Sequence, residues 1–157
     1  MMRTRRRDRH KGHRAPVFLV AFVTFVALVV FVSVVAAQNA AGSVWDGVYT
    51  DAQAKRGEAI YYERCAACHG SDLEGGDMTP ALVGGVFTSN WNDLSVGDLF
   101  ERIRISMPLD RPSSLSRQQT ADVVGFLFKA NRWPAGATEL PRDLEPLKEI
   151  TIQAVKP

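Results

Sequence analysis

The hydrophobic residues of this chain form one unbroken apolar stretch near the N-terminus, followed by shorter segments in which apolar and polar residues alternate with helical spacing. Residues 15–37 include no charged side chain, and residues 3–14 before them hold seven Lys or Arg and one acid, Asp8. As a helix the apolar stretch is about 35 Å long, enough to cross a bilayer. Residues 1–37 are therefore predicted to be a signal peptide or an N-terminal membrane anchor, with the small residues before Gln38 suited to cleavage.

The basic flank also predicts where the rest of the chain lies. Positive charge stays on the cytoplasmic side, so everything after about residue 38 is expected in the periplasm or on the outer face of the cytoplasmic membrane. Residues 38–157 hold 12 Lys or Arg against 16 Asp or Glu. This exported part is acidic, so we expect no nucleic-acid partner, and about 120 residues suffice for one domain.

Three segments have apolar residues at helical spacing. The first begins at Asp51, the expected N-cap. The second begins with a capping box of Ser95 and Asp98 and ends near Met107, before a proline. The third begins at Ser116, with a glutamine three residues later, and runs to about residue 131. These segments predict an all-α domain over residues 51–133.

The segments around these helices are predicted to be irregular. Residues 38–50 are expected to be a linker, and Gly70 to Trp91 is too rich in glycine for a helix or a buried strand. Residues 134–157 contain four prolines and are expected to be an extended C-terminal strap, with a short β segment at Glu149 to Ala154.

Cys65-Ala66-Ala67-Cys68-His69 is the pattern for covalent attachment of a c-type haem. Each thiol adds to one haem vinyl group, and His69 is then placed to bind the iron. The other ring nitrogen of His69 is expected to be oriented by a backbone carbonyl, for which Pro80 is the candidate.

Other interpretations of the same five residues stay open. A zinc site needs four ligands, but these are the only cysteines, and the other two histidines, His10 and His13, lie in the basic N-terminal stretch. A thioredoxin-like redox pair would need a βαβ context. A disulfide across two residues would be strained, and coincidence is the remaining alternative.

Two methionines lie beyond the apolar stretch and could supply a second iron ligand. Met107 is favoured because it stands 38 residues after His69, at the predicted end of a helix, where the chain can have reached the opposite haem face. Met78 is only nine residues after His69. The alternative for Met107 is a methionine that only fills the core. Ligation by His69 and Met107 leaves the iron no open position, which favours electron transfer over catalysis.

The order of helix, haem motif, glycine-rich loop, helix, Met-Pro, loop and helix resembles the class I monohaem cytochromes c over roughly residues 51–133. The motifs that carry the resemblance are Cys65 to Gly70, Gly57 with Tyr61, Pro80-Ala81-Leu82, Trp91, Met107-Pro108 and Val123 to Leu127. More narrowly, Ser114-Leu115-Ser116 and Asn131 to Gly136 resemble the short cytochromes found beside quinoprotein dehydrogenases.

The resemblance implies a small cytochrome c fold, with three to four helices around one covalent haem c. Gly57 and Tyr61 would let the first helix cross closely over the last, where Phe126 replaces the tyrosine frequent in the family. Trp91 would contact the haem or a propionate, although a purely packing role is equally open.

The function expected from the resemblance is a single-electron carrier, not an enzyme. Its partners would be a dehydrogenase donor and a downstream cytochrome or oxidase acceptor. Asp72, Glu74 and Asp77 are expected to form a solvated loop or a docking surface. Two alternatives remain: a haem subunit tethered in a larger dehydrogenase complex, and a haem sensor or enzyme with an open sixth site.

Overall fold

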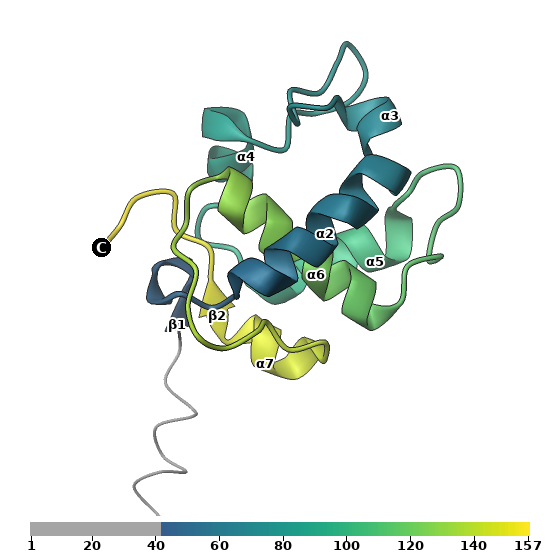
Figure 1. Cartoon of the computed structure of the whole chain (residues 1–157). Helices are drawn as coiled ribbons and strands as arrows, with labels where there is room; N and C mark the ends of the chain where they lie inside the picture. Colours follow the sequence, from purple (N-terminus) through teal and green to yellow (C-terminus); the bar gives the residue numbers. More distant parts are fainter. Residues whose placement is uncertain (1–41) are drawn as a thin grey trace, which may run out of the picture. The chain divides into compact units, whose positions relative to one another are not determined.

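The computed structural model describes residues 42–157, and the predicted signal or anchor segment at residues 1–37 lies outside them. Within the described residues no helix is both long and apolar enough to cross a membrane. The fold is all-α apart from one pair of two-residue strands (Figure 1). The elements in order are β1 (Gly42–Ser43), the 3₁₀ helix η1 (Val44–Asp46), α2 (Asp51–Arg64), α3 (Ala66–His69), α4 (Gly84–Trp91), α5 (Val96–Ser106), α6 (Arg117–Ala130), α7 (Leu144–Lys148) and β2 (Ile150–Thr151).

The three predicted helices are present as α2, α5 and α6, and local side chains determine where they begin. The capping box of Ser95 and Asp98 opens α5, as predicted. A second box, formed by Ser116 with the side chain of Gln119, opens α6. The expected N-cap of the first helix was wrong by one residue, because the Thr50 hydroxyl accepts the Gln53 N–H at 3.1 Å and α2 starts at Asp51.

Helix α4 contradicts the expectation that Gly70 to Trp91 is irregular throughout. Its side chain Phe87 is fully buried, and the Phe87 and Trp91 rings lie 6.4 Å apart, one turn along the helix. Gly84 has φ +74°, which suits a glycine, and its N–H donates to the side-chain oxygen of Asn131 at 3.0 Å. Contacts with distant residues therefore stabilise a helix that its glycines disfavour.

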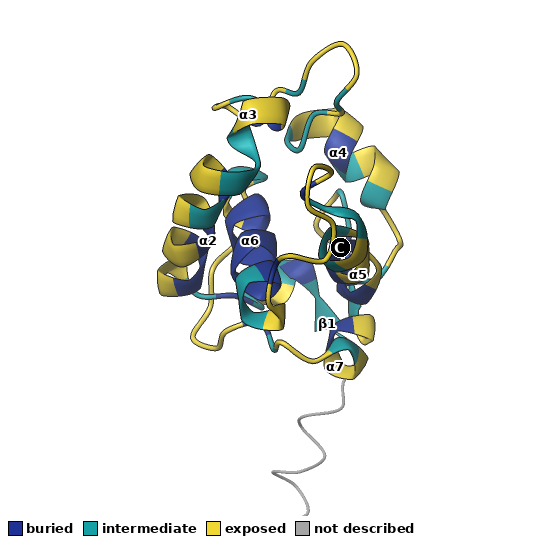
Figure 2. Cartoon of the chain, turned by 90° about the vertical axis from the view of Figure 1, so that its right-hand side faces the viewer, coloured by how far each residue is buried: buried dark blue, intermediate teal, exposed yellow. Residues whose placement is uncertain are grey.

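Helices α2 and α6 cross closely and form the centre of the fold (Figure 1). A Cβ placed on Gly57 would lie only 1.9 Å from the Asp122 carbonyl oxygen, so the two backbones meet where Gly57 has no side chain. One turn later the rings of Tyr61 and Phe126 lie 5.2 Å apart. This is the close crossing that the resemblance implied. In Figure 2 most of α6 is buried, as is the inner face of α2.

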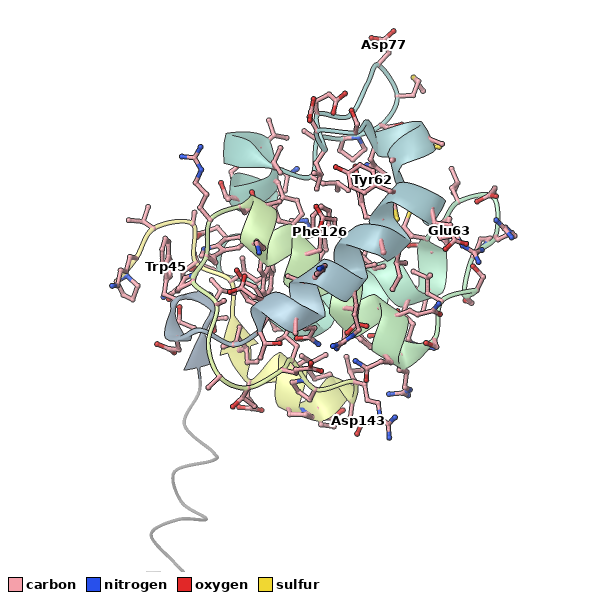
Figure 3. The ribbon with its side chains drawn as sticks, viewed as in Figure 1. Trp45, Tyr62, Glu63, Asp77, Phe126 and Asp143 are labelled. Carbon is pink, nitrogen blue, oxygen red and sulfur yellow. The ribbon has the colours of Figure 1, made fainter. Side chains whose placement is uncertain are left out.

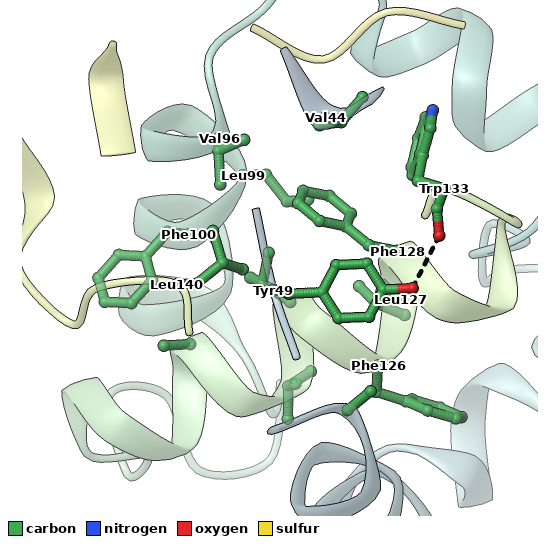
Figure 4. Close-up of a cluster of buried hydrophobic side chains, with 14 of the residues drawn as sticks. Val44, Tyr49, Val96, Leu99, Phe100, Phe126, Leu127, Phe128, Trp133 and Leu140 are labelled. Atoms are coloured by element: carbon green, nitrogen blue, oxygen red, sulfur yellow. Dashed lines mark hydrogen bonds between the residues drawn. The ribbon is translucent and has the colours of Figure 1, made fainter. Parts of the chain in front are cut away.

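Aromatic side chains from several segments complete the core (Figure 4). Phe128 makes edge contacts with Tyr49 and with Trp133, at centroid distances of 6.2 Å and 5.2 Å. The Tyr49 hydroxyl donates to the Trp133 carbonyl at 2.7 Å. Burial, with the nearby Asp51 carboxylate, raises the pKa of Tyr49 to about 12, so the hydroxyl remains a donor across the physiological range.

The described part of the predicted linker, residues 42–50, is packed onto the domain. Strand β1 pairs in parallel with β2, and Val44 is fully buried. The indole nitrogens of Trp45 and Trp133 both donate to the Gln153 carbonyl, at 3.0 Å and 3.1 Å. The two ends of the described chain are thereby joined.

The C-terminal strap predicted for residues 134–157 follows the domain surface and includes one short helix, α7. Strand β2 falls within the β segment predicted at 149–154. The strap is held at Gln53, whose buried amide exchanges two hydrogen bonds with the Leu140 backbone, at 3.1 Å and 2.8 Å. The boundaries of the proposed domain division remain predictions.

Candidate functional site

The two cysteines lie on a single helical turn that continues from α2. Cys65 caps the end of α2 through its N–H to the Tyr61 carbonyl, at 2.8 Å, and α3 follows at once. The N–H groups of Cys68 and His69 both donate to the Cys65 carbonyl, at 3.1 Å and 2.9 Å. Gly70 then leaves the helix with φ +81°, and its carbonyl accepts the Tyr61 hydroxyl at 2.6 Å. This turn brings both sulfurs and the imidazole to one end of the molecule.

The imidazole of His69 is held by the carbonyl that the sequence pointed to. Its Nδ1 lies 3.1 Å from the Pro80 oxygen, and the residue is buried. A carbonyl can only accept, so Nδ1 is the donor of this hydrogen bond, and Nε2 is the ring nitrogen left to bind a metal. The backbone between them is folded back by Gly75 N–H to the His69 carbonyl and Leu82 N–H to the Leu73 carbonyl, both at 2.8 Å.

One cavity, with a volume of about 430 Å³, contains all the predicted site residues. It is lined by Cys65, Cys68, His69, Pro80, Trp91 and Met107. Its walls are mainly apolar. The lining also includes side chains that the sequence pattern identified only as helix residues or not at all: Leu99 and Ile103 of α5, Val123 and Leu127 of α6, Phe87 and Asn90 of α4, and Arg102. Leu99 and Ile103 are four residues apart on α5, as are Val123 and Leu127 on α6. This spacing could have placed each pair on one face of its own helix.

The donor set and the cavity fit a covalently bound haem. A haem is a flat and largely apolar group, and here an apolar pocket presents two thiols and an oriented imidazole. Cys65 and Cys68 form no disulfide with each other. Burial, with a smaller effect of Cys68, raises the pKa of the Cys65 thiol to about 11. A redox-active dithiol needs a thiol of lowered pKa, so this environment does not favour that alternative.

The side chains of the described residues do not suit the zinc alternative. Nowhere in residues 42–157 do three or more His, Cys, Asp or Glu side chains gather in a group that could hold a metal ion. Tetrahedral zinc would need four such ligands.

Both candidate methionines line the cavity, in different settings. Met107 is the C-cap of α5, where its N–H donates to the Ile103 carbonyl at 2.9 Å, and it is half-buried before the buried Pro108. Met78 is 95% exposed on the loop between α3 and α4. Asp77 stands beside it at the tip of that loop (Figure 3), and Asp72 and Glu74 are exposed as well. The structure thus places Met107 on a helix end and Met78 on a solvated loop.

Comparison with known proteins finds one family model and one solved structure that are similar to this chain. Residues 52–127 match the model of the family described as cytochrome c oxidase, cbb3-type, subunit III. A chain in the crystal structure of the sulfane dehydrogenase SoxCD from Paracoccus pantotrophus is similar, with 22% sequence identity and a TM-score of 0.48. That alignment covers 69% of this chain and 61% of the other. No curated protein matches the chain.

Proposed function

We propose that this protein is a c-type cytochrome and a single-electron carrier, in which His69 and Met107 would bind the iron of a covalent haem c. The observation that carries the proposal is the single apolar cavity shared by both thiols, the oriented imidazole and the Met107 side chain. Cys65 and Cys68 would hold the haem through thioether bonds. Haem c supplies a one-electron Fe(III)/Fe(II) couple when bound.

The residues around the cavity are suited to electron transfer. The Pro80 carbonyl orients the His69 ring and increases its basicity. A thioether such as Met107 is a soft ligand that favours ferrous iron and raises the midpoint potential. Leu99, Val123 and Leu127 supply an apolar wall that excludes water, which has the same effect on the potential.

The donor of electrons is proposed to be a dehydrogenase. Support comes from Ser114-Leu115-Ser116 and from the run Asn131 to Gly136, which resemble the short cytochromes found beside quinoprotein dehydrogenases. A downstream cytochrome or oxidase would accept the electron. The exposed carboxylates of Asp72, Glu74 and Asp77 would give one partner a charged docking surface, so partner reduction should slow as salt is added.

The proposed location is the periplasm or the outer face of the cytoplasmic membrane. Support comes from the sequence, in which a strongly basic segment precedes 23 uncharged residues, 15–37. If that segment stays in place, the cytochrome would be tethered and could act as a haem subunit of a larger dehydrogenase. Stable co-purification with a dehydrogenase would favour this second function over a freely exchanging carrier.

The test is the optical spectrum of the haem-loaded protein in both oxidation states, with and without carbon monoxide. We expect a low-spin spectrum with the weak far-red sulfur-to-iron band, and no change with carbon monoxide. A high-spin or readily carbonylated protein would contradict the proposal and favour a sensor or enzyme with an open sixth site.

The ligand itself is tested with a matched pair of variants. Met107→Ala should abolish the far-red band and let the ferrous protein bind carbon monoxide, because the sixth position opens. Met78→Ala should keep the natural spectrum. Loss of the band in Met78→Ala, with its retention in Met107→Ala, would assign the ligand to Met78 instead.

A further inference from the structure

Asn131 has more polar contacts with distant backbone than its place at the end of a helix requires. It is the C-cap of α6. Its side-chain oxygen accepts the Gly84 N–H at 3.0 Å, and its amide nitrogen donates to the Leu82 and Leu127 carbonyls, both at 2.9 Å. Only the contact to Leu127 is local. The other two join the last core helix to a segment 47–49 positions earlier, directly after Pro80.

Few other side-chain hydrogen bonds reach the backbone around Pro80 and Leu82. In the described chain, side-chain hydrogen bonds to the backbone of residues 75–83 come from His69 and Asn131. Pro80 has no N–H, so it donates no backbone hydrogen bond. Leu82, two residues further on, is the fixed point: its N–H donates to the Leu73 carbonyl at 2.8 Å, and its carbonyl accepts from Asn131.

Helix α6 is a rigid support for this contact. Every residue from Thr120 to Phe128 is buried, and the helix is locked against α2 at Gly57. The amide of Asn131 therefore connects a rigid core helix with a loop that is otherwise rich in glycine. The Pro80 carbonyl, which contacts His69 Nδ1, lies two residues before the Leu82 carbonyl that Asn131 holds.

We propose that Asn131 is a positioning residue for the axial histidine: its amide fixes Leu82 and Gly84, and this keeps the Pro80 carbonyl on His69 Nδ1. The inference rests on the proposed ligation of iron by His69. A hydrogen bond at Nδ1 makes the imidazole a stronger donor to a metal. Without Asn131, the bond opens more often, the imidazole becomes a weaker donor and the reduced iron is favoured.

The experiment compares Asn131→Leu with Asn92→Leu in the haem-loaded protein. Asn92 is a matched control because it is the C-cap of α4 and also holds distant backbone, accepting the Ala154 N–H at 2.8 Å, while its side-chain hydrogen bonds go to Asp93 and Ala154 and not to the loop that carries Pro80. The primary readout is the rate of solvent exchange of the His69 Nδ1 hydrogen, measured by NMR in the ferrous state. The midpoint potential is the second.

We expect exchange at Nδ1 to become about tenfold faster in Asn131→Leu, because the His69–Pro80 contact is weakened by about the free energy of one ordinary hydrogen bond, and the midpoint potential to rise. Neither should change in Asn92→Leu, even where both variants melt at lower temperature. Should Asn131→Leu fail to fold, Asn131→Asp keeps the acceptor for Gly84 and removes the donor to the Leu82 and Leu127 carbonyls, and the same acceleration is expected.

Equal exchange rates at His69 in the Asn131 and Asn92 variants would overturn the inference. That result is distinct from failure of the proposed function, which would show in the natural protein as a spectrum without a low-spin, His-ligated iron.

Discussion

At the scale of single residues, the crossing of α2 and α6 depends on the absence of one methyl group. The space that a Gly57 side chain would fill is taken by the Asp122 carbonyl oxygen. Backbone cannot move aside as the end of a flexible side chain can, because it belongs to a buried helix. The contact also positions Tyr61 beside Phe126, one turn before the thiol-bearing segment.

The substitution Gly57→Ala should therefore lower the free energy of unfolding by about 2–3 kcal/mol, since α2 and α6 must separate to admit the methyl group. The check is chemical denaturation of the haem-loaded protein. Gly85→Ala is the matched control, because a Cβ at that position would have nothing within 4 Å and α4 would gain a better helix former. That variant should be unchanged or more stable by up to about 1 kcal/mol. Equal losses in the two variants would refute the steric explanation.

Residue-level chemistry is the part of the candidate site that a local sequence pattern expresses most directly. Cys65, Cys68 and His69 are recognised by spacing alone, and the Pro80 carbonyl follows from what an axial histidine needs. Asn131 was singled out only as part of a resemblance, with no role in the site. Its contacts with Leu82 and Gly84 depend on how α6 ends relative to a distant loop, which no local pattern encodes.

At the scale of elements, local signals gave the correct starts of α5 and α6 and missed that of α2 by one residue, and tertiary contacts produced the element that was missed. The Ser95 and Ser116 capping boxes are complete within four residues, so they can be read from the sequence. Helix α4 has two glycines in its first turn, and its formation depends on burying Phe87. A prediction from local composition therefore assigned it to a loop.

The capping box of α5 has a testable pH dependence. Hydrogen bonds from the Ser95 hydroxyl and N–H, at 2.7 Å and 2.9 Å, lower the pKa of Asp98 below its usual value of 3.8. A carboxyl whose pKa is lower in the folded state stabilises the protein above the unfolded pKa, and this contribution is lost as the pH falls through the folded value.

Asp98→Ala should accordingly lower the free energy of unfolding by about 1 kcal/mol at neutral pH, the usual contribution of a helix cap. The difference from the natural protein should shrink below about pH 4 as the carboxyl becomes protonated. Denaturant titrations at a series of pH values measure this. Glu101→Ala, an exposed carboxyl on the same helix, is the control and should show little effect at any pH. A deficit for Asp98→Ala that persists unchanged into acid would argue against the cap.

At the scale of the whole molecule, residues outside the predicted helical domain belong to its core. Val44 and Tyr49, from the expected linker, are almost completely buried, and β1 pairs with β2 from the far end of the chain. The helical order and the thiol-bearing motif were enough to predict the fold class. They could not predict these end contacts, because pairing between residues at opposite ends of a domain has no local signature.

Starting the domain at Thr50 should therefore lower its stability by about 3 kcal/mol or more, through loss of the buried side chains Val44 and Tyr49. Thermal unfolding followed by circular dichroism on the haem-loaded protein is the measurement. Removing only residues 155–157, which are exposed, is the control and should leave the melting temperature nearly unchanged. Similar melting of the Thr50-start form and the natural domain would show that the β1 segment is dispensable.

The pairing of β1 with β2 also fixes where the chain enters the domain. In both Figure 1 and Figure 2, β1 and α7 lie at one pole, and α3 with its thiol pair lies at the other. A domain coupled to a solid support through an added residue just before Gly42 would stand with α3 uppermost. An electrode coated in this way would hold the thiol-bearing pole at the far side of the protein layer, whereas coupling through the loop of Asp77 would invert the layer and bring that pole against the conducting surface.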